Sequence, residues 1–180
     1  MQLKTNYLWD CTYKSEETAA CKKVANSAGI MNNGVAFDGK ETIVLADSVG
    51  RTVKVFTVNA DGSLQLTQTV NTSSIPDNIT YDAKRNRFTV AGLNSPLEYF
   101  LLPTKLDTYL SNKGSKSVVS NQGIVETIQV NKTSKLYEAT EIFASSWTIV
   151  GLAGALVDEA GNYIFLTSFT DKSVVVCSKK

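Results

Sequence analysis

Short runs of β-branched and aromatic residues dominate the chain, and clusters of glycine, asparagine, aspartate and serine separate them. Runs of this kind with polar breaks between them are typical of β-strands. No long stretch repeats apolar residues with the period of a helix. The sequence therefore predicts an all-β fold, with strands at residues 42–48, 52–59, 64–72, 87–93, 97–102, 124–130, 163–170 and 173–177.

Three segments of the chain align with one another. Each has a strand that ends in aspartate, a turn, an apolar strand, a small polar turn and a further strand. The first two units begin at Gly34 and Asn78, which are 44 residues apart. A repeat of this length with about four strands is typical of a propeller blade. We interpret the strand-ending aspartates as turn residues whose carboxylates accept backbone N–H groups; they are Asp38, Asp82 and Asp158.

The repeats divide the chain into an N-terminal hairpin at 1–30, blades at 31–75 and 76–131, and a last blade at 132–180. An insertion delays the start of the third unit. Its polar part, 103–123, is expected to be a surface loop with a short helical turn at 106–110. The chain therefore predicts about three blades of four-stranded antiparallel sheet within one domain.

Asn33 and the pair Asp77–Asn78 occupy the same place in the first two units, at the start of a strand. In a radial arrangement of repeats, equivalent positions converge on one axis. Carboxamide and carboxylate oxygens gathered there suit a hard cation such as calcium. Taken alone, each motif is typical of a tight turn, since asparagine, aspartate and glycine favour turns. The shared repeat position strengthens the case for a metal site, and the turn interpretation stays open at this point.

Composition excludes several kinds of function. The charge is nearly balanced, with 18 Lys+Arg against 17 Asp+Glu, so we expect no nucleic-acid partner. Because the chain has no histidine, Ser-His-Asp and Cys-His mechanisms are excluded for these residues. Its three cysteines form no CxxC pair, which makes a zinc site improbable. We find neither a signal peptide nor a membrane span and expect a soluble chain, although its localisation stays undetermined.

The first part of the chain predicts a hairpin that pairs residues 7–13 with residues 18–25. In that pairing, Cys11 and Cys21 face each other across the two strands. Their positions allow either a cross-strand disulfide or two free thiols.

The segments Met31–Phe37 and Pro76–Asp82 are similar to a known group. They resemble the serum paraoxonase/arylesterase family, within the superfamily of senescence marker protein-30, gluconolactonase and strictosidine synthase. The resemblance covers roughly residues 5–178. It implies a six-bladed propeller with calcium in the central tunnel. Asn33, Asp77 and Asn78 match the family's ligand positions, where the ion polarises an ester or lactone carbonyl.

The resemblance extends only to the C-terminal half of that family. The family's histidines and its remaining calcium ligands have no counterpart here, and Cys177 matches a terminal cysteine whose partner is absent unless Cys11 or Cys21 replaces it. The resemblance therefore implies half of a calcium-dependent esterase or lactonase, inactive as an isolated chain. The first interpretation is that the chain is a fragment or a truncated gene product of such a protein; otherwise a separate N-terminal half or a second copy would close the ring. The alternative is a non-catalytic propeller domain that binds partners and retains only the fold.

Overall fold

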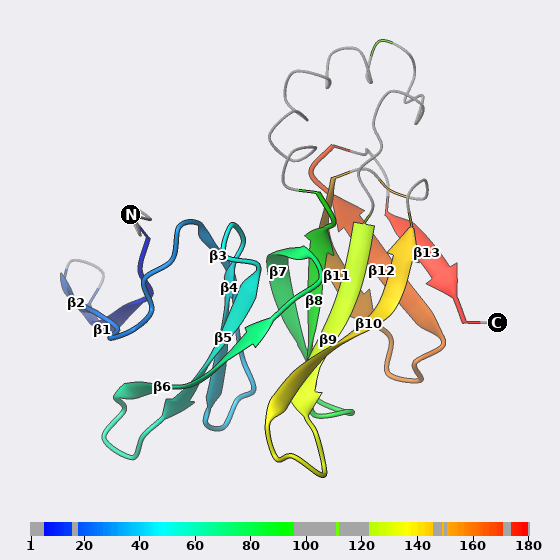
Figure 1. Ribbon diagram of the computed structural model, residues 1–180. Helices are drawn as coiled ribbons and strands as arrows, with labels where there is room; N and C mark the ends of the chain where they lie inside the picture. Colours follow the sequence, from blue (N-terminus) through cyan, green and yellow to red (C-terminus); the bar gives the residue numbers. More distant parts are fainter. Residues whose placement is uncertain are drawn as a thin grey trace.

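The computed structural model describes residues 6–15, 18–95, 111, 123–145, 149, 151–170 and 174–179. Within this part of the chain, strands β1 to β13 form one hairpin and three antiparallel sheets that follow one another in sequence order (Figure 1). The all-β, partial-propeller fold expected from the sequence is confirmed. No described segment forms an apolar helix of membrane-spanning length.

The first sheet contains β3 (Asn32–Phe37), β4 (Thr42–Asp47), β5 (Thr52–Val58) and β6 (Leu64–Asn71) in that order. Each strand pairs with the next along the chain, as in an up-and-down meander. The turn between β5 and β6 forms because Gly62 adopts a φ of 79°, a conformation that glycine reaches without steric cost. The Asn59 N–H closes this turn on the Ser63 carbonyl at 2.8 Å.

The second sheet contains β7 (Ile75–Asp82), β8 (Arg87–Leu93), β9 (Gly123–Val130) and β10 (Tyr137–Ser145). Because β8 pairs directly with β9, the insertion lies between two strands of this sheet. The strand expected at 97–102 and the helical turn expected at 106–110 lie outside the described residues, as does most of the loop expected at 103–123. Strand β10, which falls in the range expected for the last blade, pairs with β9 and belongs to this sheet.

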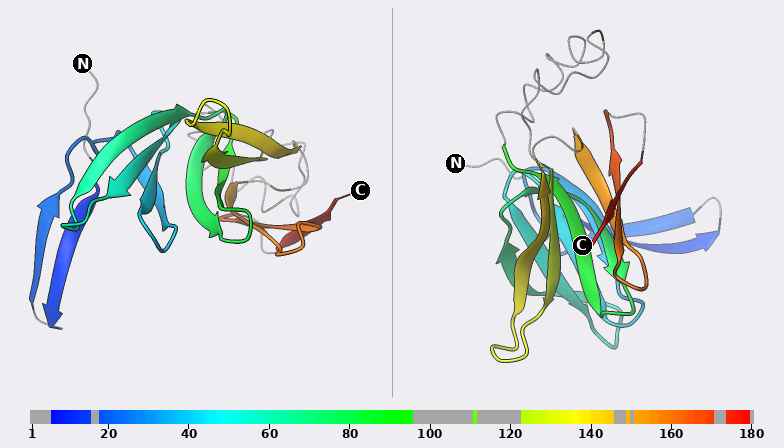
Figure 2. Two further views of the ribbon diagram at one scale, coloured as in Figure 1. Left: turned by 90° about the horizontal axis from the view of Figure 1, so that it is seen from below. Right: turned by 90° about the vertical axis from the view of Figure 1, so that its right-hand side faces the viewer.

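The third sheet contains β11 (Leu152–Val157), β12 (Tyr163–Ser168) and β13 (Val175–Ser178). In the described residues it has three strands, whereas each of the other two sheets has four. Figure 2 shows the three sheets in succession along a curved row, with the hairpin at one end and β13 at the other.

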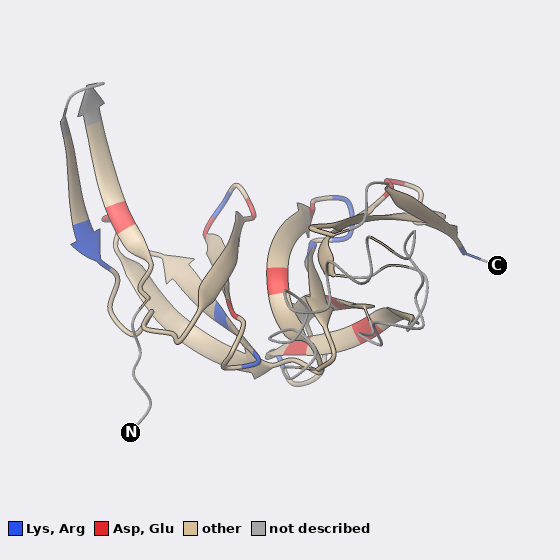
Figure 3. Cartoon of the chain, turned by 90° about the horizontal axis from the view of Figure 1, so that it is seen from above, with Lys and Arg blue, Asp and Glu red and all other residues tan. Residues whose placement is uncertain are grey.

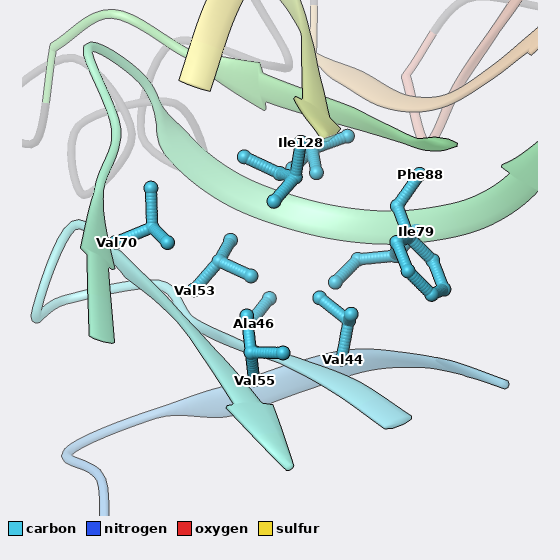
Figure 4. Close-up of a cluster of buried hydrophobic side chains, with 9 residues drawn as sticks. Val44, Ala46, Val53, Val55, Val70, Ile79, Phe88 and Ile128 are labelled. Carbon is cyan, nitrogen blue, oxygen red and sulfur yellow. The ribbon is translucent and has the colours of Figure 1, made fainter. Parts of the chain in front are cut away.

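Apolar side chains fill the space between consecutive sheets. The first junction contains Val44, Ala46, Val53, Val55 and Val70 from the first sheet and Ile79, Phe88, Val90 and Ile128 from the second (Figure 4). The second junction contains Ala91, Leu93 and Val125 from the second sheet, Leu152, Ala155 and Leu166 from the third, and Ile149. Since burying one Val, Leu, Ile or Phe side chain contributes about 1.5–3 kcal/mol, these two junctions hold the row together.

The hairpin pairs β1 (Trp9–Ser15) with β2 (Thr18–Lys23) and places Cys11 opposite Cys21. The two cysteines form a disulfide, which decides between the alternatives that the sequence left open. Cys177 is a free thiol. At the base of the hairpin, Val24 packs with Leu45 and Phe56 of the first sheet, on the side away from the second sheet.

Candidate functional site

The three sheets bring their first strands side by side, in the order β3, β7, β11. All three strands carry a register shift close to their start. The shift lies between Asn32 and Val35 in β3, between Pro76 and Ile79 in β7, and between Leu152 and Gly154 in β11. Bulges of this kind redirect side chains and are common near functional sites. The candidate residues Asn33, Asp77 and Asn78 therefore lie at equivalent bulges.

The structure brings Asn33 and Asp77 together. The Asn33 carboxamide lies near the Asp77 carboxylate and, as a hydrogen-bond donor, favours its ionised form. Burial of the Asp77 carboxyl raises its pKa to about 6, and the Asn33 hydrogen bond offsets only part of that effect. In the described part of the chain, no Lys or Arg forms a salt bridge with Asp77. Near neutral pH the site therefore holds a half-buried negative charge without a cationic partner.

Gly34 allows strands β3 and β7 to approach each other closely. A Cβ atom at this position would lie 2.4 Å from the Asp77 carbonyl oxygen and 2.6 Å from the Asn78 Cα. Both atoms belong to the backbone and cannot rotate away. The Asn33-Gly34 sequence thus places a polar side chain and a strand contact at adjacent positions.

Asn78 links the second sheet to the third. Its side-chain Nδ2 donates to the Ala153 carbonyl oxygen at 2.9 Å, and the Thr80 hydroxyl donates to the Ala155 carbonyl at 2.9 Å. Ala153 is the counterpart of Asn33 and Asp77 in the third unit, and its side chain has no oxygen. The row of polar side chains on the first strands therefore ends at the second sheet.

Asn33, Asp77 and Asn78 carry side-chain oxygens of the kind that hard cations bind. The Asn78 amide uses its N–H group for the bond to Ala153, and the Asn33 amide acts as a donor toward Asp77, so their carbonyl oxygens are not engaged in these contacts. With the Asp77 carboxylate they supply three oxygens and one negative charge, whereas calcium takes about 6–8 oxygens. No group of three or more His, Cys, Asp or Glu residues suited to a metal occurs in the described residues. The set is thus compatible with calcium but is only part of a full shell.

The recurring aspartates lie at the other end of the first strands and have the turn role expected from the sequence. Asp38 Oδ1 accepts the Lys40, Glu41 and Thr42 N–H groups at 2.8, 3.0 and 2.9 Å. Asp158 accepts two backbone N–H groups in the same way, from Ala160 and Tyr163. These bonds confirm that the strand-ending aspartates stabilise turns.

Two features of the surroundings were missed by the sequence reasoning. Glu126 is almost fully buried, and its carboxylate accepts the Ser73 and Ser74 N–H groups and the Ser74 hydroxyl. It thereby fixes the segment that leads into β7. A glutamate within the apolar run 124–128 was a signal that could have been noticed. The second missed feature is the bond from Asn78 to the Ala153 carbonyl. The sequence gives no signal for it, because every residue has a backbone carbonyl.

No family model matches the chain, and a search of curated proteins finds no relative. Solved structures of similar fold do exist. A functionally unknown protein from Desulfotomaculum acetoxidans DSM 771 aligns with a TM-score of 0.53 at 17% identity, covering 89% of this chain and 40% of that one.

Two further structures have the same kind of similarity. A "putative 6-phosphogluconolactonase" from Bacteroides fragilis NCTC 9343 aligns with a TM-score of 0.54 at 17% identity, covering 89% of this chain and 37% of that one. A second "putative 6-phosphogluconolactonase", from Bacteroides uniformis ATCC 8492, aligns with a TM-score of 0.53 at 11% identity, covering 89% of this chain and 41% of that one. At these identities the similarity shows the fold alone. The chain spans about two fifths of the length of these structures.

Proposed function

We propose that this chain supplies part of a divalent-cation site to a propeller that hydrolyses ester or lactone bonds. The observation that carries the proposal is the Asp77 carboxylate, half-buried beside Asn33 and without a cationic partner in the described residues. Keeping an ionised carboxylate in such a place is costly unless a cation compensates it. A calcium ion bound there would do so, with Asn33, Asp77 and Asn78 as ligands.

The substrate class is supported by two independent similarities. The motifs around Asn33 and Asp77 resemble those of paraoxonases and arylesterases, and two structures of similar fold have a lactonase name. Bound calcium would polarise the ester or lactone carbonyl and stabilise the negative charge that develops on its oxygen. The role of this chain is to hold three oxygens in place through the close contact between β3 and β7.

Thermal unfolding with calcium and with a chelator tests the cation site. We expect calcium to raise the unfolding midpoint of the native chain, because a ligand that binds only the folded state stabilises it. Asp77→Asn should lose most of the response, since it removes the only charge of the ligand set. Asp158→Asn, which changes a turn carboxylate at the other end of the first strands, should keep the response. An unchanged midpoint in the native chain would contradict the cation site.

Hydrolysis of phenyl acetate and of a simple lactone tests the reaction. We expect little or no turnover from this chain alone, because its three oxygens leave about half of a calcium shell unfilled. Rapid turnover that persists in chelator would show that hydrolysis does not depend on the proposed cation.

A further inference from the structure

The two ends of the row of sheets each leave an apolar surface open. We call the face of a sheet that points toward the preceding sheet its earlier face, and the opposite face its later face. At each internal junction, the later face of one sheet packs against the earlier face of the next sheet. The open surfaces are the part of the first sheet's earlier face around Val35 and Phe37 and the later face of the third sheet. The described part of the chain therefore carries one surface of each kind.

The later face of the third sheet is apolar and exposed. Leu156 pairs with Phe165, which pairs with Val176, so these three side chains form a row across the sheet. Leu156, Val174 and Val176 are each more than half exposed. Strands β11, β12 and β13 contain no charged residue, and Figure 3 shows them without charge along their length. The polar groups that these strands add to this face are the hydroxyls of Tyr163, Thr167 and Ser178.

The earlier face of the first sheet forms one wall of a groove. The groove has a volume of about 310 Å³ and runs between the first sheet and the hairpin. Val35 and Phe37, about half exposed, line it together with Ile43, Val58 and Leu64 of the same face, and Trp9 and Cys11 line it from the hairpin. The hairpin stands beside this face at the end of the row, as Figure 2 shows. If another sheet preceded the first sheet, we expect that its outer strands would lie where the hairpin lies.

The third sheet lacks, among its described strands, the outer strand that the other two sheets have. In those sheets the outer strands β6 and β10 touch, because the Gln68 amide donates to the Tyr137 carbonyl and accepts from the Tyr137 N–H. Where the next outer strand would continue this contact, a pocket of about 370 Å³ lies open. Ile142 and Phe143 of β10 line it, together with Cys177 of β13. A hairpin placed beside β13 would cover this pocket.

We propose that a second copy of this chain fills both surfaces in a head-to-tail arrangement. The third sheet of one copy enters the groove of the other, packs on its first sheet, and lies edge-on to its disulfide-linked hairpin. This junction resembles the packing between consecutive sheets, except that Val24 at the base of the hairpin already covers Leu45 and Phe56 of the receiving face. Two such junctions related by a twofold axis close a ring of six sheets from two chains. The partner is a second copy because each molecule offers one surface of each complementary kind.

The solution mass of the chain tests this arrangement. Native mass spectrometry and light scattering should give twice the 19.5 kDa of one chain. Val176→Glu on the third sheet and Phe37→Glu on the first should each give monomers, because both place a charge within the junction. Both side chains are about half exposed in the single chain, so the variants should fold, as circular dichroism would verify. Leu136→Glu, at an equally exposed apolar residue in the β9–β10 turn, should remain dimeric.

Mixing the two monomeric variants tests the head-to-tail geometry. A Val176→Glu chain keeps an intact first sheet, and a Phe37→Glu chain keeps an intact third sheet, so a mixture should form a complex with one chain of each. A monomeric native chain would overturn the proposal. So would a Phe37→Glu variant that stays dimeric while Val176→Glu does not, since the third sheet would then pair with itself.

Discussion

Asp77 gives the site its dependence on pH at the scale of single residues. Its pKa of about 6 in the folded chain lies above its ordinary value of 3.8, so the folded state binds the proton more tightly than the unfolded state. This contribution to stability is fully present below about pH 4 and is lost as pH rises through 6.

The Asp77→Asn variant should reveal how much stability the folded chain loses when Asp77 is ionised. Without added cation, we expect it to be more stable than the native chain at pH 7.5, by on the order of 2 kcal/mol once solvent screening of the partly exposed carboxyl is allowed for. The difference should vanish near pH 4, where the native carboxyl is protonated in the folded state. Urea unfolding at the two pH values measures it. An equal difference at both would show that ionisation of Asp77 is not the cause.

Gly34 makes a second prediction at this scale. Gly34→Ala should lower the free energy of unfolding by about 1–3 kcal/mol, because its Cβ meets the backbone of β7 and forces the first two sheets apart. Gly154→Ala, at the equivalent position of the third unit, should cost less, since its Cβ meets mainly the Thr167 side chain. Chemical unfolding of both variants provides the comparison. Equal losses would mean that the close approach of β3 and β7 is not what requires Gly34.

At the scale of elements, Arg85 ties the β7–β8 turn to the β11–β12 turn. Its guanidinium donates to the Asp82 carboxylate at 2.7 Å and to the carbonyls of Asp158 and Glu159 at 3.1 and 2.8 Å. Arg85→Ala should lower the free energy of unfolding by about 1.5–3 kcal/mol, because charge-assisted bonds are lost and the poorly exposed Asp82 carboxylate keeps only the longer salt bridge, to Arg87, of the two it has in the described residues. The exposed neighbour Lys84→Ala should change little. Thermal unfolding of the two variants tests this contact between the turns. An equal loss of stability in Arg85→Ala and Lys84→Ala would contradict it.

The hairpin is held in shape by its disulfide. Replacing Cys11 and Cys21 by alanine frees a short loop and should reduce the stability of the hairpin by about 2–3 kcal/mol. Hydrogen exchange should then accelerate at β1 and β2, while β4 and β5 keep their protection. In the proposed dimer, the variant should also dissociate at higher protein concentration than the native chain. Unchanged exchange in the hairpin would show that strand pairing alone keeps it ordered.

At the scale of the whole molecule, most of what the sequence predicted about the fold came from its three aligned repeat units. The aligned units predicted the sheets and the equivalence of Asn33 and Asp77, whose side chains the structure places close together. Strand β10 was missed because glutamate, threonine and serine interrupt its apolar residues and none of its side chains is fully buried, so its sequence lacks the continuous apolar signal of a strand. The raised pKa of Asp77 was also missed, since it arises from burial between neighbouring strands.

The central claim is that the Asp77 carboxylate is held without a cationic partner and is a ligand for a divalent cation. Nuclear magnetic resonance of the Asp77 side-chain carboxyl carbon, followed against pH with and without calcium, tests it most directly. The account predicts a pKa of about 6 without calcium and a lower one with it, since a bound cation favours the ionised form. A pKa near 3.8 that does not change when calcium is added would contradict the account.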